Sequence, residues 1–70
     1  MKIAIVEDDM QMYERLQTYL YELLGSSAEC VYFPSGEFFL QDWHPGAFDL
    51  IILDIFMDRL TGMDVAREIR

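Results

Sequence analysis

The chain has 70 residues, with 13 acidic side chains against 5 lysines and arginines, a formal net charge of −8. This length allows one small domain with a limited core, and the acidic charge excludes a basic surface that binds nucleic-acid phosphates. A single cysteine, Cys30, excludes an internal disulfide and a metal site of clustered cysteines. The chain shows neither a signal peptide nor an apolar run of membrane-spanning length, so we expect a cytoplasmic protein without a membrane partner.

The first half of the chain predicts a strand, a helix and a second strand. Residues 2–6 are rich in Ile and Val, which is typical of a short buried strand. Over residues 10–24 large apolar residues recur at helical spacing, and we expect Asp8 or Asp9 to cap this helix and Gly25 to end it. Residues 28–33 form a second β-type run, which ends at a proline. We expect the apolar side of the helix to be Met12, Leu16, Leu20, Leu23 and Leu24.

The second half predicts another helix, a strand and the beginning of a third helix. A short helix is expected from Ser35 through Trp43, with Phe38 and Phe39 on its apolar side. Residues 48–53 are almost continuously apolar, which is typical of a parallel strand buried on both faces. Residues 63–70 begin a third helix, whose expected inner residues are Met63, Val65, Ala66 and Ile69.

Acidic residues follow two of the predicted strands. Strands that alternate with helices form a parallel sheet with right-handed crossovers, so all three strands end at one edge. Ligands of open α/β sheets bind at that edge, where Glu7, Asp8 and Asp54 can converge. Two charges about 5 Å apart repel by about 3 kcal/mol at an effective dielectric constant near 20. The cluster therefore predicts a bound cation or shifted protonation.

Oxygen ligands of high charge favour Mg²⁺, which tolerates few protein ligands and keeps several waters. Mg²⁺ held by carboxylates commonly neutralises phosphate oxygens, and a carboxylate can itself accept a phosphoryl group. This chemistry favours Asp54 as the acceptor, with Glu7 and Asp8 holding the ion. The alternative, on composition and spacing alone, is that the acids before residue 10 cap a helix and that Asp54 belongs to a turn.

Three segments, residues 2–9, 48–57 and 61–66, occur in an order and at separations that resemble the receiver domain of two-component response regulators. The resemblance covers the whole chain. It implies a flavodoxin-like, doubly wound parallel sheet with strand order 2-1-3-4-5, of which this chain carries the 2-1-3 portion. It also implies a site at the switch point between the first and third strands.

The resemblance assigns a role to each site position. Asp54 matches the phosphorylated aspartate, Asp8 the direct Mg²⁺ ligand, and Glu7 its partner, which acts through water. Phe56 matches the position whose backbone carbonyl completes the metal site. We interpret Asp9 first as a helix cap.

The chain also departs from the family pattern. Asp58 stands where receivers usually carry proline, and neither the Ser or Thr that ends a fourth strand nor the Lys that ends a fifth is present. We therefore expect residues 1–70 to be a receiver domain truncated after the third helix, with weak phosphoryl acceptance and no switching. The sequences of residues 57–62 and of the first strand most resemble those of receivers joined to LytTR-type DNA-binding output domains.

The resulting hypothesis is a signalling receiver rather than an enzyme: a sensor histidine kinase phosphorylates Asp54, and DNA is reached only through an output domain absent from the chain. The alternative is a receiver-like interaction module that works without phosphorylation. An aspartate-nucleophile phosphatase is disfavoured, because Phe56 stands where those enzymes place a second aspartate. The apolar third strand lies at an open edge, so we also expect an oligomer, a swapped dimer or aggregation.

Overall fold

A computed structural model describes residues 1–54 and 62–69. Its elements confirm the predicted alternation of strands and helices. In chain order they are β1 (Lys2–Val6), α1 (Met10–Leu24), a 3-10 turn η1 (Gly25–Ser27), β2 (Glu29–Phe33), α2 (Gly36–Asp42), β3 (Leu50–Leu53) and α3 (Gly62–Glu68).

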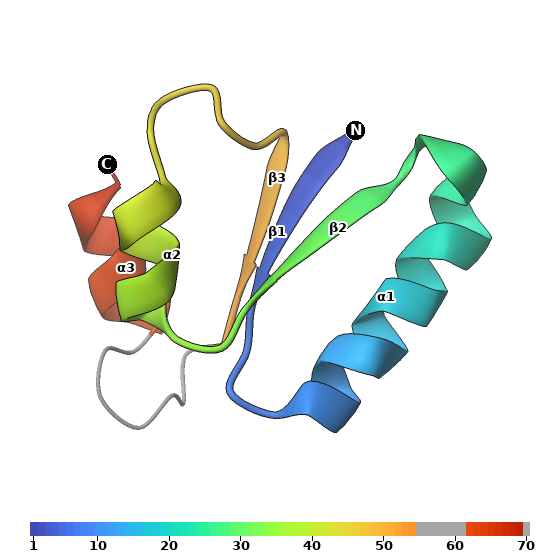
Figure 1. Cartoon of the computed structure of the whole chain (residues 1–70), viewed down its shortest axis with the longest axis horizontal. Coiled ribbons are helices and arrows are strands. Elements are labelled where there is room, and N and C mark those ends of the chain that lie inside the picture. Colours follow the sequence, from blue (N-terminus) through green and yellow to red (C-terminus); the bar gives the residue numbers. More distant parts are fainter. Residues whose placement is uncertain (55–61, 70) are drawn as a thin grey trace.

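The three strands form one parallel sheet in the order β2-β1-β3. Figure 1 shows α1 on one face of this sheet and α2 with α3 on the other. This arrangement confirms the expected doubly wound fold. Because all strands run the same way, their carboxyl ends meet at one edge, where the chain leaves β1 toward α1.

The central strand β1 supplies the core of both layers. Residues of a strand point alternately to its two faces. Ile3 and Ile5, both 0% exposed, pack with Leu16 and Leu20 on the α1 side. On the other side Ala4 and Val6 pack in a cluster with Phe33, Phe39 and Val65. Burial on both faces explains why this strand is almost wholly apolar.

Helix α1 has the predicted bounds, but its apolar side is only partly covered. Asp9, not Asp8, caps it, and Gly25 ends it with φ +64°, a conformation that favours glycine. Met12 is 41% exposed and Leu23 80%, so their expected burial was wrong. The helix reaches the sheet through a narrower stripe, namely Tyr13, Leu16 and Leu20. Leu24 is likewise exposed, at 38%.

Two expectations for the second half of the chain were also wrong. Phe38 is 55% exposed, whereas the neighbouring Phe39 is fully buried against Phe33, because adjacent helical residues point about 100° apart. Strand β3 is half-buried rather than buried on both faces, and Leu50 is exposed. The physical reason is the strand order, which places β3 at an edge of the sheet.

Helix α2 is one residue shorter at each end than expected, because Ser35 and Trp43 are its caps. In α3, Val65 is fully buried and Ile69 packs against the same cluster, as expected. The predictions that concern Phe56, Asp58 and residue 70 lie outside the described residues. No helix in the described part of the chain is both long enough and apolar enough to cross a membrane.

Candidate metal centre

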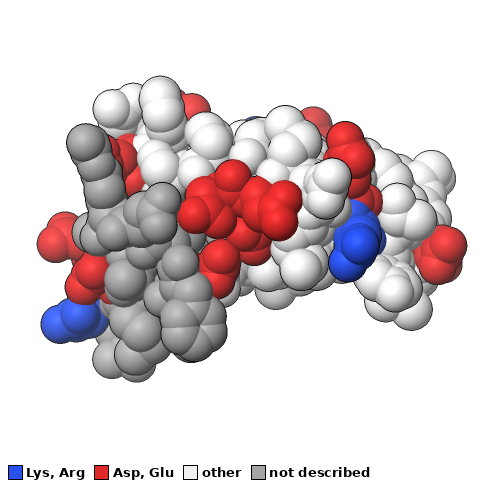
Figure 2. Space-filling model, turned by 90° about the horizontal axis from the view of Figure 1, so that it is seen from below, with Lys and Arg blue, Asp and Glu red and all other residues white. Residues whose placement is uncertain are grey.

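Three carboxylates meet at the carboxyl edge of the sheet. Glu7 and Asp8 follow β1, Asp54 follows β3, and one oxygen from each lies within 4.8 Å of the others. Figure 2 looks onto this edge and shows acidic side chains gathered at the middle of the surface. The predicted convergence of Glu7, Asp8 and Asp54 is therefore present in the structure.

Two of the three residues are held in place by backbone hydrogen bonds to a neighbouring strand. The N–H of Glu7 donates to the carbonyl of Phe33 at the end of β2, at 3.0 Å. The N–H of Asp54 donates to the carbonyl of Val6 at the end of β1, at 3.1 Å. Each acid thus continues the parallel pairing by one step before the chain turns away. The sheet therefore sets the spacing between Glu7 and Asp54.

Asp9 supports the cluster without belonging to it. Its side chain caps α1 by accepting a hydrogen bond from the N–H of Gln11 at 2.9 Å, so its carboxylate is committed to the helix. Its own N–H donates to Oε1 of Glu7 at 3.2 Å. This bond couples the start of α1 to the orientation of the Glu7 carboxyl, which agrees with the interpretation of Asp9 as a cap.

The three carboxylates differ sharply in exposure. Glu7 is buried at 8% exposure, Asp54 is half-buried and Asp8 is exposed. Burial raises the pKa of Glu7 from 4.5 to about 7, and hydrogen bonding with the carboxyls of Asp54 and Asp8 adds to the rise, against the opposing Asp9 N–H. Near neutral pH the Glu7 carboxyl therefore exchanges between its protonated and its ionised form.

One wall of the site is apolar, which the sequence analysis did not foresee. The cavity that contains the three acids is also lined by Met12 and Leu16 of α1 and by Ile52 of β3. The wall could have been predicted from the alternation of side chains along β3, which places Ile52 on the α1 side of the sheet. An apolar wall lowers the local dielectric, so charges in the cavity interact more strongly than in open water.

This donor set fits a hard divalent cation. Three carboxylate oxygens from a rigid edge suit Mg²⁺, which takes few protein ligands and retains waters. Burial makes the ionised form of Glu7 costly without a positive partner, so this carboxyl either keeps its proton or pairs with a cation. Phe56, expected to offer a backbone carbonyl, lies outside the described residues.

Comparisons with known proteins agree with this fold. The model of the response regulator receiver domain family matches residues 3–70. The response regulator protein TodT of Pseudomonas putida is 37% identical over 68 residues, which cover 97% of this chain and 29% of TodT. The aerobic respiration control sensor protein ArcB of Escherichia coli is 30% identical over 66 residues, 94% of this chain and 8% of ArcB. The transcriptional regulatory protein CiaR of Streptococcus pneumoniae is 32% identical over 69 residues, 99% of this chain and 29% of CiaR. The chain thus spans less than a third of the length of each of these relatives.

Proposed function

Because the chain belongs to the response regulator receiver domain family, we propose that it accepts a phosphoryl group on Asp54 from a sensor histidine kinase, with Mg²⁺ held by Glu7, Asp8 and Asp54. The observation that carries the proposal is the meeting of three carboxylate oxygens within 4.8 Å at the sheet edge. The backbone carbonyl of Phe56 is proposed as a further ligand on the resemblance alone.

The chemistry follows from the position of Asp54. An oxygen of its carboxylate attacks the phosphorus of a phosphohistidine, the P–N bond breaks, and its electron pair returns to the imidazole; the product is an aspartyl phosphate. When bound, Mg²⁺ neutralises charge on the phosphoryl oxygens. The backbone bond from Asp54 to Val6 fixes the attacking residue, and the N–H of Asp9 orients Glu7. On this proposal the chain is a phosphoacceptor that assists its own modification, not an enzyme acting on other substrates.

Partners and output are proposals drawn from the relatives. TodT and CiaR are named as regulators and ArcB as a sensor, so this receiver fits between a kinase and an effector. We propose a cytoplasmic location and control of transcription through a DNA-binding domain outside these 70 residues. The surface charge of this chain does not favour DNA by itself, since the net charge is −8.

The test is labelling by acetyl phosphate with Mg²⁺, followed by intact-mass measurement and hydroxylamine cleavage, which is diagnostic of an acyl phosphate. We expect wild type to be labelled and Asp54→Asn not to be. Asp42→Asn, an exposed aspartate at the end of α2, is the matched control and should be labelled like wild type. Labelling of Asp54→Asn at the wild-type level would overturn the assignment. A wild type that binds Mg²⁺ yet takes no label would favour the phosphorylation-independent interaction module.

A further inference from the structure

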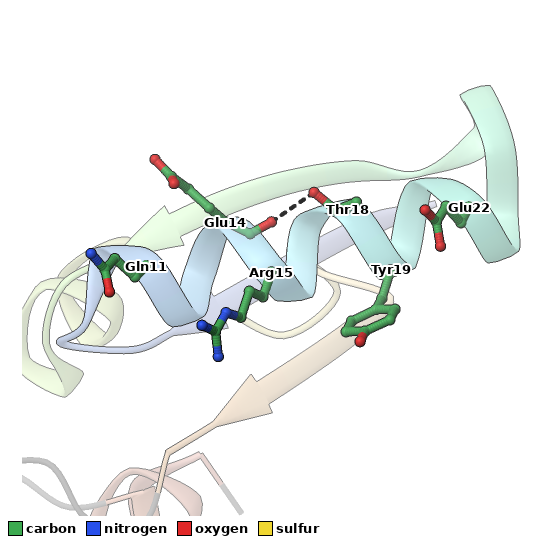
Figure 3. Close-up of a pocket in the computed structure, with 6 residues that line it drawn as sticks. All are labelled: Gln11, Glu14, Arg15, Thr18, Tyr19 and Glu22. Atoms are coloured by element: carbon green, nitrogen blue, oxygen red, sulfur yellow. Dashed lines mark hydrogen bonds between the residues drawn. The ribbon is translucent and has the colours of Figure 1, made fainter.

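Asp9 connects the first turn of α1 to the metal centre through three polar groups. Its carboxylate accepts a hydrogen bond from the N–H of Gln11 at 2.9 Å, and its carbonyl accepts one from the N–H of Tyr13 at 3.0 Å. Both bonds tie Asp9 to α1, and Figure 3 shows Gln11 in the first turn, at the end of the helix that the chain enters from β1. The third group, the N–H of Asp9, donates to Oε1 of Glu7 at 3.2 Å. Asp9 is thus held by the helix and in turn holds a carboxyl of the site.

These bonds belong to a closed cycle of contacts. Glu7 is fixed from the other side, because its N–H donates to the carbonyl of Phe33 at the end of β2. Next to Phe33, the ring of Tyr32 packs against the ring of Tyr13, with 4.5 Å between their centroids. The cycle therefore runs from β2 to Glu7, on through Asp9 to α1, and back to β2. Each of its contacts lies between positions 7 and 33 of the chain.

The direction of the Asp9 N–H depends on the cap. Asp9 has an extended backbone, with φ −102° and ψ 111°, and the helix begins at the next residue, Met10. The bond from the N–H of Gln11 to the Asp9 carboxylate holds this junction of loop and helix in one geometry. A helix end without a cap leaves its first N–H groups without a partner and frays. Loss of the cap therefore removes the fixed donor that holds Oε1 of Glu7.

We propose that Asp9 is a positioning residue of the metal centre: by capping α1 it fixes the N–H that orients Glu7 for a divalent cation, although Asp9 is not itself a ligand. This inference rests on the proposed Mg²⁺ site and adds to it a residue outside the cluster of three acids. Asp8 lies between the two fixed residues, so the cap restrains its backbone as well. Removal of a group that orients a metal ligand typically weakens metal binding by about 10- to 100-fold.

The first test compares two substitutions of Asp9 by titration with Mg²⁺, followed through the backbone amide resonances of residues 7–9. Asp9→Asn and Asp9→Ala both remove one negative charge near the site, but only alanine removes the oxygen that caps α1. The difference between wild type and Asp9→Asn thus measures the effect of the charge. We expect Asp9→Ala to bind Mg²⁺ about tenfold more weakly than Asp9→Asn. Far-ultraviolet circular dichroism at the temperature of the titration confirms that each variant is folded.

Two further variants separate positioning from stability. Glycine is tolerated at a helix cap with little loss of stability, but it offers no side-chain oxygen to the N–H of Gln11. We expect Asp9→Gly to bind Mg²⁺ as weakly as Asp9→Ala while unfolding at nearly the same urea concentration as Asp9→Asn. Ser35→Ala is the matched control, because it removes the cap of α2, where the Ser35 hydroxyl accepts from the N–H of Phe38 at 3.2 Å. It should lower the stability of the fold without changing the affinity for Mg²⁺.

The proposal is overturned if Asp9→Ala or Asp9→Gly binds Mg²⁺ as tightly as Asp9→Asn. It is also overturned if Ser35→Ala weakens binding as much as Asp9→Ala does, because the affinity would then follow the stability of the fold and not the cap of α1. Labelling of Asp54 by acetyl phosphate at saturating Mg²⁺ should persist in all four variants, so a failure of this inference leaves the proposed function intact. A wild type that binds no Mg²⁺ would overturn both.

Discussion

Substitution of Glu7 by glutamine tests whether burial of this carboxyl governs the stability of the site. The folded pKa of about 7 exceeds the ordinary 4.5, so the folded chain binds a proton that the unfolded chain has released between these values. Stability from this group is therefore fully present below about pH 4.5 and is lost as the pH rises through 7. The shift corresponds to roughly 3 kcal/mol at high pH. Glutamine stays neutral and cannot incur this loss.

The measurement is the free energy of unfolding by urea, followed by Trp43 fluorescence and circular dichroism at several pH values. We expect the difference between Glu7→Gln and wild type to grow by roughly 3 kcal/mol in favour of the variant between about pH 4 and about pH 8. Glu29→Gln, at an exposed glutamate at the opposite end of the sheet, is the control and should show no such growth. A difference that does not change with pH would refute the reasoning.

Addition of Mg²⁺ should narrow the difference in unfolding free energy between the two proteins at high pH. At a free concentration of ten times the dissociation constant, the ion stabilises the wild type by about 1.4 kcal/mol at high pH. The Glu7→Gln variant lacks one ionised oxygen donor and should gain less. An equal gain in both proteins would show that Glu7 does not take part in holding the ion.

Three further predictions follow from the packing and the caps. Phe39→Ala should cost about 3 to 5 kcal/mol of unfolding free energy, because the ring is fully buried, whereas Phe38→Ala next to it should cost little. Gly25→Ala should cost about 1 to 3 kcal/mol through backbone strain alone, since φ +64° with ψ −146° is a conformation that favours glycine and nothing lies within 4 Å of the added methyl group; a stability equal to wild type would contradict this. Asp9→Ala should cost about 1 kcal/mol through loss of the helix cap, whereas Asp9→Asn, whose side chain can still accept the capping hydrogen bond, should keep the stability of the wild type. Unfolding by urea measures the change in free energy for each of these variants.

Several parts of the molecule could be predicted from the sequence because their signals are local. The bounds of α1 matched because capping by Asp9 and the positive φ of Gly25 depend only on neighbouring residues. The convergence of Glu7, Asp8 and Asp54 was predictable because parallel strands end at one edge. The strand order 2-1-3 was expected from the resemblance, not from the pattern of residues, and the sheet confirms it.

Tertiary structure alone decided which apolar residues are covered and which carboxylate is buried. Phe38 and Phe39 are chemically identical, as are Leu20 and Leu23, yet within each pair only one packs against the sheet. Glu7 and Asp8 are adjacent acids, but Glu7 alone is buried and holds a proton to a pKa of about 7. Burial depends on which neighbours a residue meets in space, and those neighbours come from distant parts of the chain. The sequence by itself thus determined the short, acidic domain and the acids at its strand ends, while the packing of α1 and β1 determined which of those acids is buried.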